Sequence, residues 1–156
     1  PIARVPLVVL DDGRVQSESN ALLLHWGEGT PLVPRDPFAR TEVLRWMFFE
    51  QNLHEPHVAT RRYWVSIARK DPDPPQVLAY WLRRGNEALR TMERHLADHA
   101  WFGPEGASAA DVALYAYTHV ADEGGFDLQP LPAVRAWLAR FAARPDHFPL
   151  GGRRSV

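Results

Sequence analysis

The β-rich part of this sequence lies entirely before Ser19, and a helical pattern occupies most of the chain after it. Val5 to Leu10 is apolar and rich in residues that favour strands. Asp11-Asp12-Gly13 gives the Asp-Gly signal of a hairpin turn, and Arg14 to Gln16 gives a second short strand. A two-stranded hairpin alone is marginally stable in water, so this one needs a further strand or a helix to cover it.

A series of helices is predicted from Ser19 onward. Ser19 itself is placed at the N-cap of the first helix, because its hydroxyl can accept a hydrogen bond from a backbone N–H of the first turn. Asp36-Pro37 predicts the start of a long helix, since a capping side chain followed by proline suits a first turn. Pro56 should bend that helix, because proline removes one backbone hydrogen bond. Further helices are expected over residues 77–98, 108–122 and 132–143, with a proline-rich loop over 71–75.

The composition narrows the class of protein. The chain has 156 residues, 46% of them apolar, and a formal net charge of −1. This is typical of a folded globular protein, and the near-zero charge argues against nucleic acid as the main partner. These residues include no cysteine, which excludes a disulfide, a thiolate metal site or a cysteine nucleophile among them. No apolar run approaches the roughly 18 residues of a membrane-spanning helix, so no membrane partner is expected.

Two short motifs near the front suggest a site for a peptide-like ligand. In Val5-Pro6, a cis proline at the head of a strand would leave the preceding backbone amide and carbonyl free to pair with an extended peptide. In Glu18-Ser19, a helix N-terminus and a serine hydroxyl would favour a carboxylate, and the glutamate would suit an ammonium group. Each motif also has a plainer explanation, which is a strand start at Pro6 and an ordinary N-cap at Ser19.

Ser108-Ala-Ala-Asp111 predicts a capping box at the start of a buried helix. The serine side chain would accept a hydrogen bond from the third helical N–H, and the Asp111 carboxylate would accept one from the N–H of Ser108. We expect these two residues to be structural rather than catalytic. The aromatic residues that follow at helical spacing, including Tyr117 and Trp137, are expected mostly in the core.

Taken together and in this order, these motifs resemble the glutathione transferase family. The resemblance implies a mainly α protein, with the family's all-helical C-terminal bundle over residues 30–156. Residues 1–29 would then be a β-hairpin and helix from an incomplete thioredoxin-like α/β domain. The segments that match are Val5-Pro6, the hairpin from Val8 to Val15, Glu18-Ser19-Asn20-Ala21, Trp46 to Pro56, Trp101-Phe102-Gly103 and Ser108-Ala-Ala-Asp111 with Val112-Ala113-Leu114.

The resemblance also implies how ligands would bind. The Val5 backbone, positioned by a cis bond to Pro6, would pair with the cysteinyl residue of glutathione. Glu18 and Ser19 would hold its γ-glutamyl end, and Arg4 would attract its glycyl carboxylate. The glutathione thiolate would then attack a small, hydrophobic electrophile. The family pattern further implies a cytoplasmic homodimer.

The electrophile pocket would be built partly on the helix that opens the C-terminal domain. Glu50, Gln51 and His54 form a polar cluster there, beside Trp46 and Phe49. The alternative interpretation of this stretch is an ordinary helix with a dimer face or a core face.

Histidine spacing is also compatible with a metal site. His54 and His57 are three residues apart and His95 and His99 are four apart, so each pair can share one face of a helix. Neither pair has an obvious third ligand, and Pro56 distorts the first spacing. We therefore expect no metal, and we expect these histidines to be exposed or to cap helices.

One part of the family pattern is not found in these 156 residues. The family's thioredoxin-like domain begins with a β-α-β unit, which supplies the Tyr, Ser or Cys that stabilises the glutathione thiolate. We expect this unit to precede Pro1 in the complete protein, which would then be a glutathione transferase. The alternative is a naturally shortened relative that serves as a non-catalytic module for interaction or ligand binding.

Overall fold

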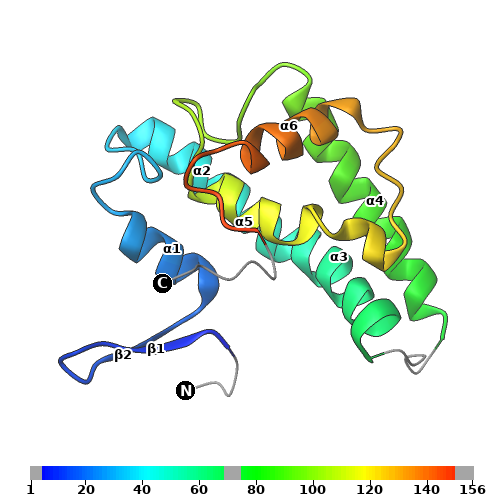
Figure 1. Ribbon diagram of the computed structural model, residues 1–156, viewed down its shortest axis with the longest axis horizontal. Coiled ribbons are helices and arrows are strands. Elements are labelled where there is room, and N and C mark those ends of the chain that lie inside the picture. The colour runs from blue at the N-terminus through cyan, green and yellow to red at the C-terminus, as the bar shows by residue number, and fades with distance from the viewer. Residues whose placement is uncertain (1–4, 69–74, 150–156) are drawn as a thin grey trace.

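The computed structural model describes residues 5–68 and 75–149. A two-stranded hairpin and helix α1 lie at one end of the molecule, and the other helices pack into a bundle beside them (Figure 1). The predicted, mainly helical fold is confirmed. The elements are β1 (Leu7–Val9), β2 (Val15–Ser17), α1 (Ser19–Gly27), α2 (Pro37–Phe49), the π-helical η1 (Glu50–His54), α3 (Glu55–Arg62), the π-helical η2 (Tyr63–Ala68), α4 (Val77–Leu96), α5 (Ala109–Thr118), the 3₁₀-helical η3 (Ala121–Gly124) and α6 (Pro132–Ala142).

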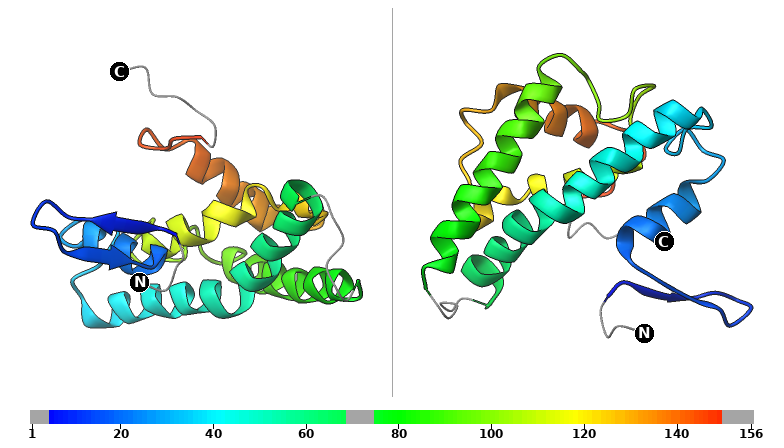
Figure 2. Two further views of the ribbon diagram at one scale, coloured as in Figure 1. Left: turned by 90° about the horizontal axis from the view of Figure 1, so that it is seen from below. Right: turned by 180° about the vertical axis from the view of Figure 1, so that it is seen from behind.

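The hairpin forms where the sequence predicts it. Strands β1 and β2 pair antiparallel, with Val8 opposite Gln16. The N–H of Leu10 donates to the carbonyl of Arg14 at 2.8 Å and closes the turn. Gly13 has a φ of 82°, a left-handed conformation that glycine adopts at little cost. Within the described part of the chain these two strands form the whole sheet, and α1 continues directly from β2 (Figure 2).

Helices α2 and α3 run end to end as one long, interrupted helix (Figures 1 and 2). It begins as predicted, because the Asp36 carboxylate accepts a hydrogen bond from the N–H of Ala39 at 2.8 Å. The interruption is η1, where the N–H of Glu55 bonds to the carbonyl of Glu50, five residues earlier. Pro56 explains this wider turn. Its ring would clash with the carbonyl four residues before it, and it has no N–H to donate.

One core joins α2, α4, α5 and α6. Leu89 of α4, Leu114 of α5 and Trp137 of α6 are fully buried in it. The packing is so close at Gly85 that a Cβ there would lie 2.4 Å from Cε1 of Phe126. A side chain at this position would therefore force α4 away from the segment that follows η3.

The buried carboxylate of Asp111 connects three segments of the bundle. It accepts hydrogen bonds from the N–H of Phe102 at 3.0 Å and from the N–H and the hydroxyl of Ser108 at 2.9 Å each. The side chain of Ser108 in turn accepts from the helix backbone, so the two residues form a reciprocal capping box. The N–H of Gly103 adds a fourth donor at 3.4 Å, and the indole of Trp137 adds a fifth at 2.9 Å. The loop before α5, helix α5 and helix α6 thus share one acceptor group.

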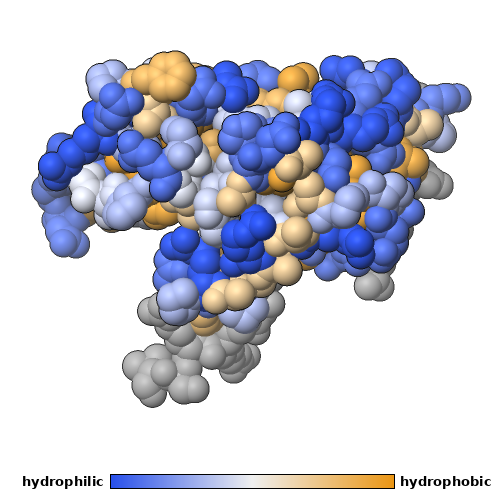
Figure 3. All heavy atoms as spheres, turned by 90° about the horizontal axis from the view of Figure 1, so that it is seen from above, coloured by the Kyte–Doolittle hydropathy of each residue, from blue (hydrophilic) through white to orange (hydrophobic). Residues whose placement is uncertain are grey.

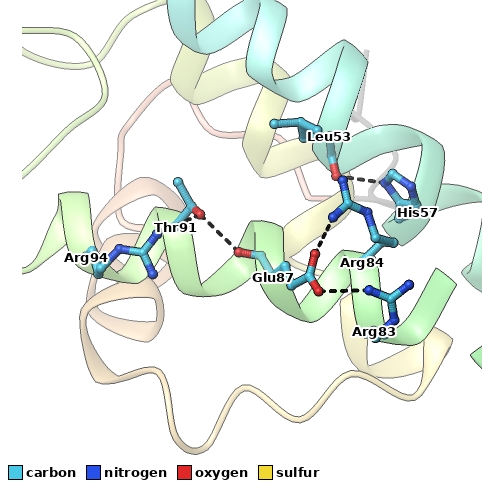
Figure 4. A network of polar contacts seen from close by, with 7 residues as sticks. All are labelled: Leu53, His57, Arg83, Arg84, Glu87, Thr91 and Arg94. Atoms are coloured by element: carbon cyan, nitrogen blue, oxygen red, sulfur yellow. Dashed lines mark hydrogen bonds and ion pairs between the residues drawn. The ribbon is translucent and has the colours of Figure 1, made fainter. Parts of the chain in front are cut away.

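The outer faces of the helices carry most of the charge. On α4, Glu87 forms ion pairs with both Arg83 and Arg84 (Figure 4). The face drawn in Figure 3 is covered mainly by hydrophilic side chains, with hydrophobic ones scattered between them. No helix among the described residues combines the length and the apolar character needed to span a membrane.

Some predicted boundaries differ from the structure. The helix expected over residues 108–122 is shorter, since α5 ends at Thr118 and the 3₁₀ segment η3 follows it. Most of the loop expected over 71–75 lies outside the described residues. The domain boundary between residues 29 and 30 stays a prediction.

Asp111→Ala should destabilise the protein strongly, because it leaves the buried donors of Phe102, Ser108 and Trp137 without their acceptor. Since one unsatisfied buried donor costs about 1–3 kcal/mol, we expect the free energy of unfolding to fall by at least about 3 kcal/mol. Urea unfolding followed by tryptophan fluorescence measures this loss. Asp98→Ala removes an exposed carboxyl and is the control, with an expected change within about 0.5 kcal/mol. A loss for Asp111→Ala as small as that of the control would contradict the role given to Asp111.

Candidate functional site

A cavity of about 460 Å³ lies where the hairpin and the start of α1 face the helical bundle. Its polar lining contains most of the residues that the sequence assigned to ligand binding. Arg4, which was assigned to the same site, lies outside the described residues. The lining residues are Val5, Pro6, Ser17, Glu18, Ser19, Gln51, Glu55 and Tyr117.

A second cavity, also of about 460 Å³, lies against α5, α6 and the segment after α6. Its lining is mainly apolar and aromatic, and it includes Tyr115, Phe141 and His147. None of the residues predicted to bind a ligand lines this second cavity. The first cavity brings the predicted ligand-binding residues together, so it is the candidate site.

Val5 offers an unpaired backbone edge to the candidate site. The Val5–Pro6 peptide bond is cis, and strand β1 begins only at Leu7. Val5 is 93% exposed, and its N–H and C=O make no hydrogen bond with another described residue. An extended peptide can therefore pair with Val5 in the way that an added strand pairs with a sheet edge.

Glu18 turns the chain from β2 into α1. Its φ of 72° and ψ of 115° place it among the positive-φ conformations, and it is the one non-glycine residue of the described chain with such a φ. Strained conformations of this kind cost about 1–3 kcal/mol and cluster at ligand sites. The turn leaves the side chains of Glu18 and Ser19 exposed beside the cavity.

Ser19 is not the N-cap that the sequence suggested. Glu18 occupies the N-cap position, because its carbonyl accepts the first helical hydrogen bond from the N–H of Leu22 at 3.0 Å. Ser19 is therefore the first residue of α1, and its hydroxyl makes no hydrogen bond within the described chain. This hydroxyl and the N–H groups of the first turn are available to a carboxylate.

A second buried carboxylate fixes the helical wall of the cavity to α1. Glu50 is 2% exposed, and its Oε2 accepts from the amide of Asn20 at 3.0 Å and from the amide of Gln51 at 2.8 Å. Asn20 also donates to the carbonyl of Met47 at 3.3 Å. Burial raises the pKa of the Glu50 carboxyl, and the Gln51 and Asn20 donors oppose part of that rise. Glu50 thus lies behind the cavity and holds Gln51, which lines it.

His54 lies in the core and does not line the cavity. Its Nε2 is 3.0 Å from the hydroxyl of Thr118, which donates its own proton to the carbonyl of Leu114 at 2.6 Å. His54 must therefore carry its proton on Nε2 and donate it to Thr118. Burial, with a smaller contribution from the charge of His57, lowers the pKa of His54 to about 3 and keeps it neutral. The expectation of an exposed or pocket-lining His54 is wrong, because Glu50 and His54 both lie on the buried side of η1.

His57 is buried as well, contrary to expectation, and its Nδ1 lies 2.9 Å from the carbonyl of Leu53 (Figure 4). His99 is exposed and stacks on His95 with ring centroids 4.3 Å apart. The described ranges contain no group of three or more His, Cys, Asp or Glu side chains that could hold a metal ion.

Sequence reasoning missed three residues of the cavity, which are Ser17, Glu55 and Tyr117. Tyr117 was assigned to the core, but it is half-buried and its side chain reaches the cavity. The helical spacing places Tyr117 on one face with Ala113. It cannot show that this face ends beside the hairpin, because that depends on how α5 packs against residues far away in the sequence.

Comparison with known proteins identifies the family. Residues 56–140 match the model of the glutathione S-transferase C-terminal domain. A glutathione S-transferase from Xanthobacter autotrophicus Py2 is 51% identical, and the match covers 92% of this chain and 70% of that one with a TM-score of 0.89. One from Pseudomonas fluorescens Pf-5 is 41% identical, and the match covers 94% and 73% with a TM-score of 0.90. The disulfide-bond oxidoreductase YfcG of Escherichia coli (strain K12) is 26% identical over 93% of this chain and 70% of its own length.

The chain therefore belongs to the glutathione S-transferase family. The resemblance found in its sequence motifs is confirmed. The two matches above 40% identity extend over almost the whole chain.

Glu50→Gln should change how stability depends on pH. The ordinary pKa of a glutamate is 4.5, and burial raises that of Glu50 in the folded protein. The folded state then keeps this proton over a range where the unfolded state has lost it, so the free energy of unfolding falls as pH rises above about 4.5. The substituted amide cannot titrate, and its carbonyl can still accept from Asn20 and Gln51. Between pH 4 and neutral pH, the free energy of unfolding of the variant should rise relative to that of the native protein. The rise should be about 1.4 kcal/mol for each unit by which burial raises the pKa of Glu50.

Urea unfolding at several pH values between about 4 and 7 measures this difference. Glu42→Gln is the control with the opposite sign, because the Arg45 guanidinium lowers the pKa of Glu42. That variant should lose a little stability relative to the native protein as pH rises. A constant difference between Glu50→Gln and the native protein across this range would contradict the account of Glu50.

Proposed function

We propose that the protein binds glutathione in the cavity between the hairpin and the bundle, and joins its thiolate sulfur to a hydrophobic electrophile. The observation that carries this proposal is the meeting of the unpaired Val5 backbone and Glu18-Ser19 in one cavity. Together they offer a backbone edge for a peptide, a helix N-terminus for a carboxylate and a carboxylate for an ammonium group. The γ-glutamyl-cysteinyl part of glutathione presents the three matching groups, which are a peptide backbone, a carboxylate and an ammonium group.

The charges of the site suit the γ-glutamyl end. Its α-carboxylate would accept hydrogen bonds from the Ser19 hydroxyl and from the N–H groups of the first turn of α1, where the helix dipole also favours a negative charge. Its α-ammonium would lie against the Glu18 carboxylate, which is acceptor-only when ionised. The cysteinyl backbone would pair with Val5. Membership of the family, with glutathione S-transferases at 51% and 41% identity, supports the same ligand.

Conjugation requires the thiolate form of glutathione, because a thiolate is the nucleophile and a thiol is not. We assign no described residue to the stabilisation of that thiolate. The family resemblance places this group on a β-α-β unit ahead of the Val-Pro strand, and that placement stays a prediction. The homodimer implied by the resemblance stays a prediction too.

Titration calorimetry with glutathione tests the binding site. Ser19→Ala should weaken binding about tenfold or more, because it removes a hydrogen bond to a charged group worth about 1.5–3 kcal/mol. Thr41→Ala is the matched control, since it removes an exposed hydroxyl that bonds only to the carbonyl of Pro37 at 2.8 Å. Equal affinities for Ser19→Ala and the native protein would refute the role of Ser19. No saturable heat from the native protein would refute the proposed function.

Turnover is measured on the complete protein with 1-chloro-2,4-dinitrobenzene, a hydrophobic electrophile whose glutathione conjugate is detected by absorbance. Formation of the conjugate above the uncatalysed rate is the expected result. Saturable glutathione binding without turnover of this or other electrophiles would contradict the enzymatic part of the proposal. It would instead support the alternative of a non-catalytic, ligand-binding module.

A further inference from the structure

Gln51 of η1 presents a carbonyl oxygen to the candidate glutathione cavity. Its side chain is exposed and lines the cavity, and its Nε2 donates to Oε2 of Glu50 at 2.8 Å. Because a carboxylate oxygen accepts this bond, the amide must turn its amino group to Glu50 and keep its carbonyl Oε1 for another donor. Within residues 5–68 and 75–149 this carbonyl accepts no hydrogen bond. Gln51 is therefore an acceptor that the bundle offers to a bound molecule.

A shared contact places this acceptor beside the first turn of α1. Oε2 of the buried Glu50 accepts from Gln51 and also, at 3.0 Å, from the amide of Asn20. Two amides bound to one oxygen lie close together, and Asn20 directly follows Glu18 and Ser19 in the chain. The carbonyl of Gln51 thus lies at the end of the cavity where the helix N-terminus and the Glu18 carboxylate are found.

The chemistry of this end suits an ammonium group. An α-ammonium has three N–H donors and no acceptor, and each donor that leaves water needs an acceptor of the protein. Glu18 offers a carboxylate from the α1 side, and Gln51 offers a carbonyl from the bundle. A ligand carboxylate could not share this carbonyl, because both groups are acceptors.

We propose that Oε1 of Gln51 accepts a hydrogen bond from the α-ammonium of the γ-glutamyl residue and makes the site specific for ligands with a free amino group there. This assignment rests on the proposed function and adds a specificity-determining residue to the same site. Gln51, which the sequence suggested for the electrophile pocket, serves the γ-glutamyl end instead. A ligand without the ammonium group binds more weakly, because it leaves Gln51 and Glu18 without a donor.

Titration calorimetry with two ligands tests this role. The ligands are glutathione and its deamino analogue, in which hydrogen replaces the α-amino group of the γ-glutamyl residue. Gln51→Met keeps the length of the side chain and removes the acceptor. It should weaken the binding of glutathione about tenfold, as expected when a hydrogen bond to a charged group is lost. The affinity for the deamino analogue should stay within about twofold of the native value, because that ligand has no ammonium for Gln51 to bind.

Asn52→Leu is the matched control, since it replaces the neighbouring exposed amide, which donates to the carbonyl of Phe48 at 2.8 Å. Its affinities for both ligands should equal those of the native protein. Native affinity for glutathione in Gln51→Met would overturn the assignment and leave the proposed function standing. An equal loss with both ligands would also overturn it, because that pattern indicates that Gln51 acts only through Glu50 or on the ligand carboxylate. A native protein that binds neither ligand would overturn the proposed function and the assignment with it.

Discussion

The buried carboxylate of Asp111 is the contact on which the arrangement of the helices depends. Five donors from the loop before α5, from the start of α5 and from Trp137 of α6 converge on its two oxygens. Burying a carboxylate is costly unless its oxygens are satisfied, so this arrangement is stable only when all three segments are in place. The position of α5 follows from it. At the far end of the same helix, the bond of Thr118 to His54 joins α5 to η1.

The candidate site depends on two further features, the contacts of Glu50 on η1 and the turn at Glu18 before α1. Glu50 of η1 accepts hydrogen bonds from Asn20 of α1 and from Gln51, so it links the first helix of the chain to the long interrupted helix. Glu18 directs the chain from the hairpin into α1 through a positive φ, which leaves the first turn open to the cavity. Val5, Ser19 and Gln51 therefore meet although they come from three separate segments of the chain. The family assignment and the geometry of the cavity both support glutathione as the proposed ligand.

Local rules were sufficient for part of this structure. The Asp-Gly turn, the capped start of α2 and the Ser-x-x-Asp spacing depend on neighbouring residues, and the sequence predicts all three. Other features depend on distant residues. The sequence shows that Pro56 must interrupt a helix, but not that a π turn absorbs it and leaves His54 in the core. The sequence likewise could not show that Trp137 donates to Asp111 or that Gly85 packs against Phe126. Nor could it show that Tyr117 lines the cavity, because all three features follow from tertiary packing.

A crystal structure of the protein with S-methylglutathione would test the central claim most directly. We expect the ligand in the cavity lined by Val5 and Ser19, with its γ-glutamyl carboxylate within hydrogen-bond distance of the Ser19 hydroxyl and the first turn of α1. We also expect that the cysteinyl backbone pairs with Val5. A ligand bound in the apolar cavity beside Tyr115, or one in the candidate site without contact to Ser19 and Val5, would contradict the proposed binding mode.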